Sequence, residues 1–290
     1  MKAFLGSEAV AEGVVSRHRL GRYRRIYPDV YLPDDRPASS LRDRIDGAWL
    51  WSHRRGVIAG VAASARHGAR WVDDDVVIEM LLCNGRPPSG VMTRNETFAD
   101  DEVTVVRGIR VTTPARTAFD LGRHLPRGQA LARMDALMRA TPFAVERVRM
   151  LADRYPGARG LCQLRELLPL VDGGAASLKK SWLRLLLIDA GFPVPTTQIP
   201  VHINYHLFAM LDMGWEEFGV AAEYDGDQHR TDRREYVRGE RRERKLPQLG
   251  WLKIKVIAED RSDDVIARVY GALRSRGWRG TLTPRLHSRR

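Results

Sequence analysis

Residues 211–230 read LDMGWEEFGVAAEYDGDQHR, and this stretch decides the fold of the second half of the chain. Two short apolar runs flank the polar connection EEFG at 216–219, which ends in glycine. Apolar runs joined by such a connection predict a β-hairpin. If the connection closes with Trp215 opposite Val220, the antiparallel register of the hairpin follows by counting.

The hairpin gathers three carboxylates on one face. In this register Asp212 lies opposite Glu223, and directly opposed side chains have Cβ atoms roughly 4.5–5.5 Å apart. Asp225 shares the face of Glu223, because strand side chains alternate with a period of two. Like charges this close repel, so the cluster is stable when one member is protonated or when a cation lies between them.

This cluster predicts a metal site. Hard oxygen ligands on a rigid sheet suit Mg²⁺ or Mn²⁺, so Asp212, Glu223 and Asp225 are the expected ligands. His229 follows, and a neutral imidazole there can activate water for hydrolysis, which makes these four the predicted catalytic residues. A plainer interpretation stays open for each residue alone, since Asp225-Gly226 is also an ordinary turn dipeptide.

The composition favours a polyanionic partner. The 290 residues suffice for two domains, and the net charge is +12 with a pI of about 10.2. DNA is therefore the expected partner, although an Arg-rich protein of another function would carry the same charge.

We expect no membrane span and no signal peptide. Cys83 and Cys162 lack a metal or redox spacing, which predicts reduced thiols and a cytoplasmic location. A protein partner or a homodimer cannot be inferred from these residues.

An arginine-rich helix is predicted after the hairpin, capped by Thr231 or Asp232 and ended by Gly250. Its basic residues recur at a helical period and would hold the DNA backbone beside the acidic cluster. They are Arg234, Arg238, Arg241, Arg242 and Lys245. The alternative is a solvated face with internal acidic partners at 240 and 243.

The remaining elements of the second half complete a sheet flanked by helices. We predict a helix over 179–190 with Ser177 as its N-cap, and a strand over 198–203. Strict alternation over 251–257 predicts another strand, with Lys253 and Lys255 on one face as further DNA contacts. A last helix is predicted over 263–276, and we expect it to cover the sheet.

The first residues predict a small DNA-binding head. A short helix over 8–15, with Ser7 as its N-cap, precedes an arginine-dense segment and a strand over 27–32. Together they predict a winged-helix-like unit whose arginines meet phosphates; a basic surface loop is the alternative. The arginines are Arg17, Arg19, Arg22, Arg24 and Arg25.

The middle of the chain carries no recognisable chemistry. Helices are predicted over 40–51 and 57–67, and a strand pair over 103–106 and 109–111 around Arg107-Gly108. Another helix opens at Thr113-Pro114. The Gly-rich segment 171–177 predicts a boundary before the C-terminal unit.

From residue 177 onward, about 110 residues resemble the Vsr-like endonuclease branch of the PD-(D/E)XK nuclease superfamily. The resemblance is carried by LDMGW at 211–215, VAAEYDGDQHR at 220–230, the arginine-rich helix and LGWLKIKV at 249–256. It implies a restriction-endonuclease-like sheet in which Asp212 and Glu223 hold the metal.

The preceding part resembles the AbiEi-type antitoxin proteins. IYPDVYLP at 26–33 is similar to their wing, and VTTPARTAFDL at 111–121 to a motif of their second region. The resemblance implies a winged-helix head over 1–34 and a scaffold domain over 35–175, before the nuclease-like domain over 176–290. The expected fold class is therefore mixed α/β.

Two residues depart from the nuclease pattern. Lys180 stands where the family often has a glutamate, and Gly239 where it has an aspartate. Lys180 could hold a DNA phosphate, or it could neutralise the acidic cluster and replace the metal. The sequence thus leaves two functions open: a Mg²⁺-dependent DNA endonuclease, or a non-catalytic DNA-binding regulator of antitoxin type built on a degenerate nuclease fold.

Overall fold

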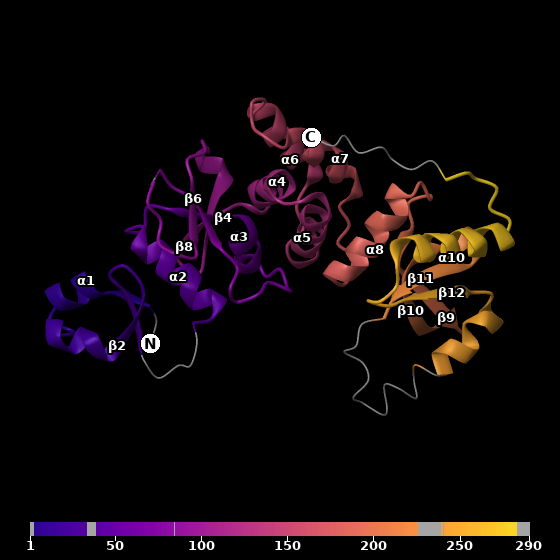
Figure 1. The fold of residues 1–290 in the computed structure, drawn as a ribbon, viewed down its shortest axis with the longest axis horizontal. Coiled ribbons are helices and arrows are strands. Elements are labelled where there is room, and N and C mark those ends of the chain that lie inside the picture. The colour runs from indigo at the N-terminus through magenta and orange to yellow at the C-terminus, as the bar shows by residue number, and fades with distance from the viewer. Residues whose placement is uncertain (1–2, 34–38, 84, 226–238, 240, 283–290) are drawn as a thin grey trace. The chain divides into compact units, whose positions relative to one another are not determined.

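The computed structural model describes residues 3–33, 39–83, 85–225, 239 and 241–282. The chain is of the predicted mixed α/β class and forms two compact units, Met1–Gly173 and Gly174–Arg290 (Figure 1). The division lies within the Gly-rich segment 171–177. None of the helices among the described residues has the length and apolar character needed to cross a membrane.

The first unit begins with a small sheet and two short helical turns. Its elements are β1 (Phe4–Leu5), α1 (Gly6–Ala11), the 3₁₀ helix η1 (Arg17–Arg22), β2 (Tyr23–Tyr27) and β3 (Val30–Pro33), with strand order β1-β3-β2. The prediction that Ser7 caps a helix starting at residue 8 is wrong, because α1 begins at Gly6. Ser7 instead donates hydrogen bonds from its amide and hydroxyl to Asp29, at 3.0 and 2.5 Å, which ties α1 to the β2–β3 turn.

A five-stranded sheet follows, with strand order β6-β5-β4-β8-β7. Its strands are β4 (Val57–Ala59), β5 (Ile78–Leu81), β6 (Val91–Arg94), β7 (Val103–Val106) and β8 (Ile109–Thr112). The predicted antiparallel β7–β8 pair is confirmed, and Arg107 and Gly108 make its turn with φ of 52° and 80°. Both turn residues adopt the left-handed backbone that two-residue hairpins favour.

The prediction of one continuous helix over 57–67 is wrong. Residues 57–59 form the central strand β4, and the helix α3 (Gly60–Arg66) starts only at Gly60. Gly60 has a φ of +57°, a left-handed conformation that a residue with a side chain rarely adopts. The switch from strand to helix therefore depends on this glycine.

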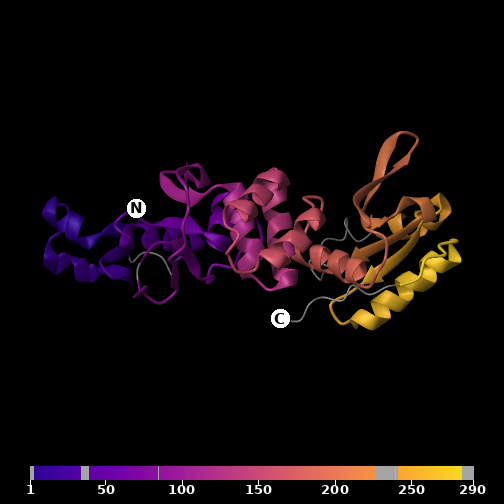
Figure 2. The ribbon, with the colours of Figure 1, turned by 90° about the horizontal axis from the view of Figure 1, so that it is seen from above.

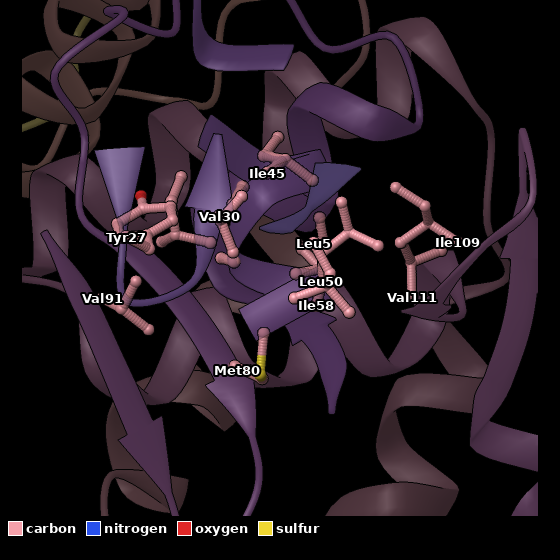
Figure 3. Close-up of a cluster of buried hydrophobic side chains, with 14 residues drawn as sticks. Leu5, Tyr27, Val30, Ile45, Leu50, Ile58, Met80, Val91, Ile109 and Val111 are labelled. Carbon is pink, nitrogen blue, oxygen red and sulfur yellow. The ribbon is translucent and has the colours of Figure 1, made fainter. Parts of the chain in front are cut away.

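One hydrophobic core joins the two sheets of the first unit (Figure 3). Helix α2 (Leu41–Trp51) contributes Ile45 and Leu50, and its predicted start is confirmed by a capping box between Ser40 and Asp43. Buried residues of both sheets pack around it: Leu5, Tyr27, Val30, Ile58, Met80, Val91, Ile109 and Val111. The segments 1–34 and 35–175, which the sequence separates, therefore share one core.

Helices complete the first unit. They are α4 (Pro114–His124), α5 (Arg127–Ala140), α6 (Val145–Arg154), α7 (Leu161–Leu167) and the short 3₁₀ helix η3 (Leu168–Leu170). Helix α4 begins as predicted, because the Thr113 side chain accepts a hydrogen bond from the Arg116 amide and Pro114 occupies the first turn.

The second unit is built on a four-stranded sheet with order β12-β11-β10-β9. Its elements are α8 (Leu178–Asp189), β9 (Thr196–Ile203), β10 (His206–Trp215), β11 (Val220–Tyr224), β12 (Leu252–Val256) and α10 (Ser262–Ser275). Figure 2 shows the β9–β10 hairpin extending away from the rest of this sheet. Leu183 and Leu187 of α8 and Val265 and Val269 of α10 join one buried cluster with the sheet.

Candidate nucleic-acid interface and acidic face

The predicted register of the β10–β11 hairpin is confirmed. Met213 pairs with Ala222 and Trp215 with Val220, so Asp212 and Glu223 occupy the next opposed positions. Gly219 closes the connection with a φ of 58°. Strand β12 lies parallel to β11 and places Lys255 beside Glu223.

We use the term acidic face for Asp212, Glu223 and Asp225, which the sheet brings to one side as the alternation predicts. Each of these carboxylates is paired with a basic side chain. The Lys180 ammonium lies 2.6 Å from Asp212 Oδ1, and Asp212 Oδ2 accepts a hydrogen bond of 3.2 Å from the Tyr224 amide. Asp212 thus has a protein donor on both of its side-chain oxygens.

Glu223 is held from two sides. Arg242 Nη2 donates to Glu223 Oε1, and Lys253 Nζ donates to Oε2 at 3.1 Å. Burial raises the pKa of Glu223, and the charges of Arg242 and Lys253 oppose that rise without cancelling it.

Asp225 lies at the exposed end of the acidic face. It comes directly after β11, and Lys255 Nζ lies 2.5 Å from its Oδ2. Within the described ranges, no group of three or more His, Cys, Asp or Glu side chains is placed to hold a metal ion. His229, the fourth predicted catalytic residue, lies outside these ranges. The acids of this face, as they are paired here, do not fit a Mg²⁺ site.

Four of the residues predicted to contact DNA form ion pairs with the acidic face: Lys180, Arg242, Lys253 and Lys255. Their contact with DNA stays a prediction. Residues 241–245 are helical; Arg241 is exposed, and Lys245 donates to Gln248 at 3.0 Å. The predicted contacts Arg234 and Arg238 lie outside the described residues, as do both proposed helix caps near residue 231.

The arginines of the predicted head take different positions. Arg17, Arg19 and Arg22 belong to η1 and are exposed. Arg25 is exposed on β2, where its Nε donates to the Tyr27 carbonyl at 3.4 Å, and Arg24 is partly buried. A shallow hollow between α1, η1 and the strands is lined by, among others, Ser7, Arg17, Tyr23, Arg25 and Tyr31. Basic and aromatic side chains therefore share one surface of the head.

A buried ionic network in the first unit was not predicted. Arg116 is 1 % exposed and donates to Glu102 and to Asp120, the latter at 3.1 and 3.2 Å. Its guanidinium carbon also lies 5.4 Å from the ring centroids of Phe119 and Tyr155. The only sequence signal was the i, i+4 spacing of Arg116 and Asp120 on a predicted helix.

Glu96 extends this network to the wall of a pocket lined also by Arg94, Arg154 and Arg159. It accepts hydrogen bonds from Arg123 at 2.6 Å and lies 3.0 Å from His124 Nε2. Burial by itself would raise the pKa of Glu96, but the His124 hydrogen bond and the Arg123 charge lower it from 4.5 to about 2.

A carboxyl group with a lowered pKa stabilises the folded state above its unfolded pKa, and this contribution disappears as the pH falls toward the folded value. We expect the wild type to lose stability between pH 4.5 and about 2 partly through Glu96. A Glu96→Gln variant should lose on the order of 1 kcal/mol less over this interval, after allowance for solvent screening. Urea unfolding at pH 7, 4 and 3 measures this; equal acid sensitivity of the two proteins would contradict the assignment.

The family comparison identifies the region that holds this network. Residues 56–170 match the family model described as the AbiEi antitoxin C-terminal domain. The resemblance of residues 111–121 to the second region of AbiEi-type proteins is thereby confirmed. The five-stranded sheet and helices α3 to α7 lie in the AbiEi-like region, together with Arg116 and its partners.

Two curated relatives come from Mycobacterium tuberculosis: Uncharacterized protein Rv2248 of strain H37Rv and Uncharacterized protein MT2308 of strain CDC 1551. Each is 34% identical over 175 residues, which cover 60% of this chain and 64% of the relative. The alignment thus spans somewhat less than two thirds of either relative. No solved structure matches the chain. The nuclease resemblance of the second unit remains a prediction.

Proposed function

We propose that the chain is a DNA-binding regulator of antitoxin type, in which the second unit contributes a metal-free platform. The observation that carries this proposal is the pairing on the acidic face. Both side-chain oxygens of Asp212 and of Glu223 accept hydrogen bonds from protein groups. A hydrolytic Mg²⁺ site needs such oxygens for the ion, which is bound through one or two carboxylates and the substrate phosphate.

The AbiEi-like region supports the regulator class. The net charge of +12 supports a polyanionic partner. The exposed arginines of η1 lie next to the β2–β3 hairpin, in an arrangement that suits a helix and a wing against a duplex. Arg17, Arg19 and Arg22 would contact phosphates, which position a protein on DNA without reading its sequence.

The second candidate function is the metal-dependent DNA endonuclease. It is favoured by the register that sets Asp212 opposite Glu223, close enough for the Asp212 charge to contribute to the raised pKa of Glu223. For hydrolysis, Lys180, Arg242 and Lys253 would have to leave these carboxylates before Mg²⁺ or Mn²⁺ could bind. Asp225 and His229 would then complete the predicted catalytic set.

Incubation with plasmid DNA separates the two functions. Supercoiled and linear DNA are incubated with the wild type or with Glu223→Ala, in Mg²⁺, in Mn²⁺ and in EDTA. We expect no nicking or linearisation by either protein under any condition, because the acidic face is already neutralised. Metal-dependent cutting by the wild type that is lost in Glu223→Ala would overturn the regulator proposal and establish the enzyme.

A further inference from the structure

The β9–β10 hairpin projects beyond the sheet that carries it (Figure 2). Strand β10 pairs with β9 along most of its length, but with β11 only at Met213, Gly214 and Trp215. Residues 199–211 therefore form a two-stranded ribbon, which we call the arm. A two-stranded ribbon is at best marginally stable when both of its faces meet water.

One face of the arm is covered by its own chain. Ile199 and Val201 of β9 and Ala209 and Leu211 of β10 are buried in one cluster with Leu246. The cross-strand pairs Ile199–Leu211 and Val201–Ala209 place these four side chains on the same face. This cluster stabilises the arm from one side.

The opposite face, here called the open face, consists of two further cross-strand pairs. His202 pairs with Leu207 and Pro200 with Met210. Leu207 is 58% and Met210 38% exposed, and the other two residues are exposed as well. A strand with one buried face normally carries polar residues on the other, so the apolar open face departs from that pattern.

The turn of the arm presents a tyrosine at a conformational cost. Asn204 and Tyr205 connect the strands with φ of 48° and 64°, the left-handed backbone of a two-residue hairpin turn. Asparagine and glycine favour this backbone, whereas a residue with a bulky side chain rarely adopts it. Tyr205 is 100% exposed, so nothing in the described part of the chain compensates for this conformation. Such a violated preference points to a contact outside the monomer.

The arm carries no charged residue. Residues 190–211 contain no Asp, Glu, Lys or Arg, in a chain of which 29% is charged. Arg242 donates to the Met210 carbonyl, but its charge is paired with Glu223. A ribbon that binds duplex DNA needs Lys and Arg to neutralise phosphates, so the composition of the arm disfavours DNA as its partner.

The same composition favours a second copy of the chain. A closed dimer brings the same surface patch of two copies together, so the patch must tolerate its own charge. Two copies with a net charge of +12 repel each other wherever basic surfaces meet, and the uncharged open face avoids this repulsion. Burying Tyr205, Leu207 and Met210 against a second copy would also remove apolar surface from water.

The edge of the arm is poorly suited to the other common way in which two sheets associate. Strand β9 is the outer strand of its sheet, and a further strand could pair only along this edge. Pro200 has no amide hydrogen to donate to such a strand, and Gln198 has a φ of 52°, which departs from extended backbone. Contact through the side chains of the open face is therefore the favoured arrangement.

We propose that the chain forms a two-fold symmetric dimer through the open face of the arm and Tyr205. This inference goes beyond the proposed function and does not rest on it. If the proposed function holds, the dimer carries two heads and is suited to a DNA site with two related halves.

Sedimentation equilibrium of the full chain without DNA tests the proposal. We expect a monomer–dimer equilibrium with a Kd on the order of 10 μM, because the interface is small. Like net charges oppose association, so raising NaCl from about 0.1 M to about 0.5 M should tighten the dimer several-fold. A wild type that stays monomeric at about 200 μM in both salts would overturn the proposal. A dimer that weakens as the salt rises would also overturn it, because its interface would be ionic.

A matched pair of variants locates the interface. Leu207→Lys adds a positive charge to the open face of each copy and should weaken the dimer by at least about 10-fold. Met150→Lys makes a similar change at a residue of the first unit that is 61% exposed, and should leave the Kd unchanged. Equal Kd values for the two variants would place the interface elsewhere and overturn the proposal. If Leu207→Lys does not fold, Leu207→Gln replaces it, and a wild-type Kd in that variant overturns the proposal.

Tyr205→Gly separates a role in the dimer from a role in the fold. Glycine fits the left-handed turn better than tyrosine, so at concentrations far below the Kd the variant should be at least as stable in urea as the wild type. Its dimer should nevertheless be weaker by at least about 5-fold. A wild-type Kd, or a loss of monomer stability that accounts for the weaker dimer, would overturn the proposal.

DNA binding is measured separately, so the two proposals can fail independently. A wild type that binds DNA but does not dimerise would overturn the dimer and leave the proposed function intact. If Tyr205→Gly then lowered the affinity of this monomer for DNA, the arm would be a DNA contact.

Discussion

A variant with Arg17→Ala, Arg19→Ala and Arg22→Ala is expected to bind duplex DNA on the order of 10- to 100-fold more weakly than the wild type at physiological salt. These three side chains are exposed on η1. Each phosphate contact that is lost removes one released counterion, so the slope of log affinity against log salt should become shallower by about 1 per arginine. Fluorescence polarisation with a labelled duplex measures both quantities.

The matched control removes the same charge from another surface of the first unit. Arg70, Arg147 and Arg149 are exposed, and their joint replacement by alanine leaves the head intact. This control should retain most of the affinity, because it changes only the long-range charge. Equal losses in both triple variants would show that the net charge, and not the head, binds DNA.

Replacing Arg116 by methionine is expected to destabilise the first unit by roughly 3–5 kcal/mol, as is typical when one partner of a buried ion network is removed. Glu102 and Asp120 are each 2% exposed and would lose their shared cation. Burial raises the pKa of Asp120, and the Arg116 charge is the largest influence opposing that rise. Without Arg116, Asp120 must either be buried as a charge or take up a proton.

Urea unfolding at pH 7 measures the loss. Arg149→Met is the control, because Arg149 is exposed on α6 and its replacement should change stability by less than about 0.5 kcal/mol. Arg116→Lys should recover only part of the stability, since an ammonium cannot reproduce the planar set of donors that reaches Glu102 and Asp120. A loss below about 1 kcal/mol in Arg116→Met would show that Arg123 and Arg154 suffice to hold these acids.

Local signals predicted much of the fold. The connection at 216–219 fixes the β10–β11 register, because Gly219 closes it in a left-handed conformation and the strand period does the rest. The β7–β8 turn and the Thr113 cap are equally local, since each depends on residues close together in sequence. The position of Asp212 opposite Glu223 follows from the same kind of information.

Other features depend on residues far apart in the sequence. The segment 57–67 predicts one helix because most of its residues are small and apolar, although Val57 and Ile58 are β-branched. Pairing with β5 and β8 makes residues 57–59 a strand. Helix α1 begins at Gly6, before Ser7, and Ser7 donates its hydrogen bonds to Asp29, 22 residues away. The family pattern predicts Lys180 near the site but leaves open whether its side chain contacts a phosphate or an acid. In the structure Lys180 donates to Asp212, which is 32 residues away in the sequence, so local signals could not predict this pair.

The affinity of the wild type for duplex DNA in EDTA, measured at several salt concentrations, tests the central claim most directly. A metal-free DNA-binding protein should bind without added cation, and its log affinity should fall linearly with log salt, with a slope set by the number of phosphates it contacts. Addition of Mg²⁺ should weaken binding only as salt does. Absence of binding in EDTA, together with tight binding restored by Mg²⁺ or Mn²⁺ and lost in Glu223→Ala, would contradict the claim.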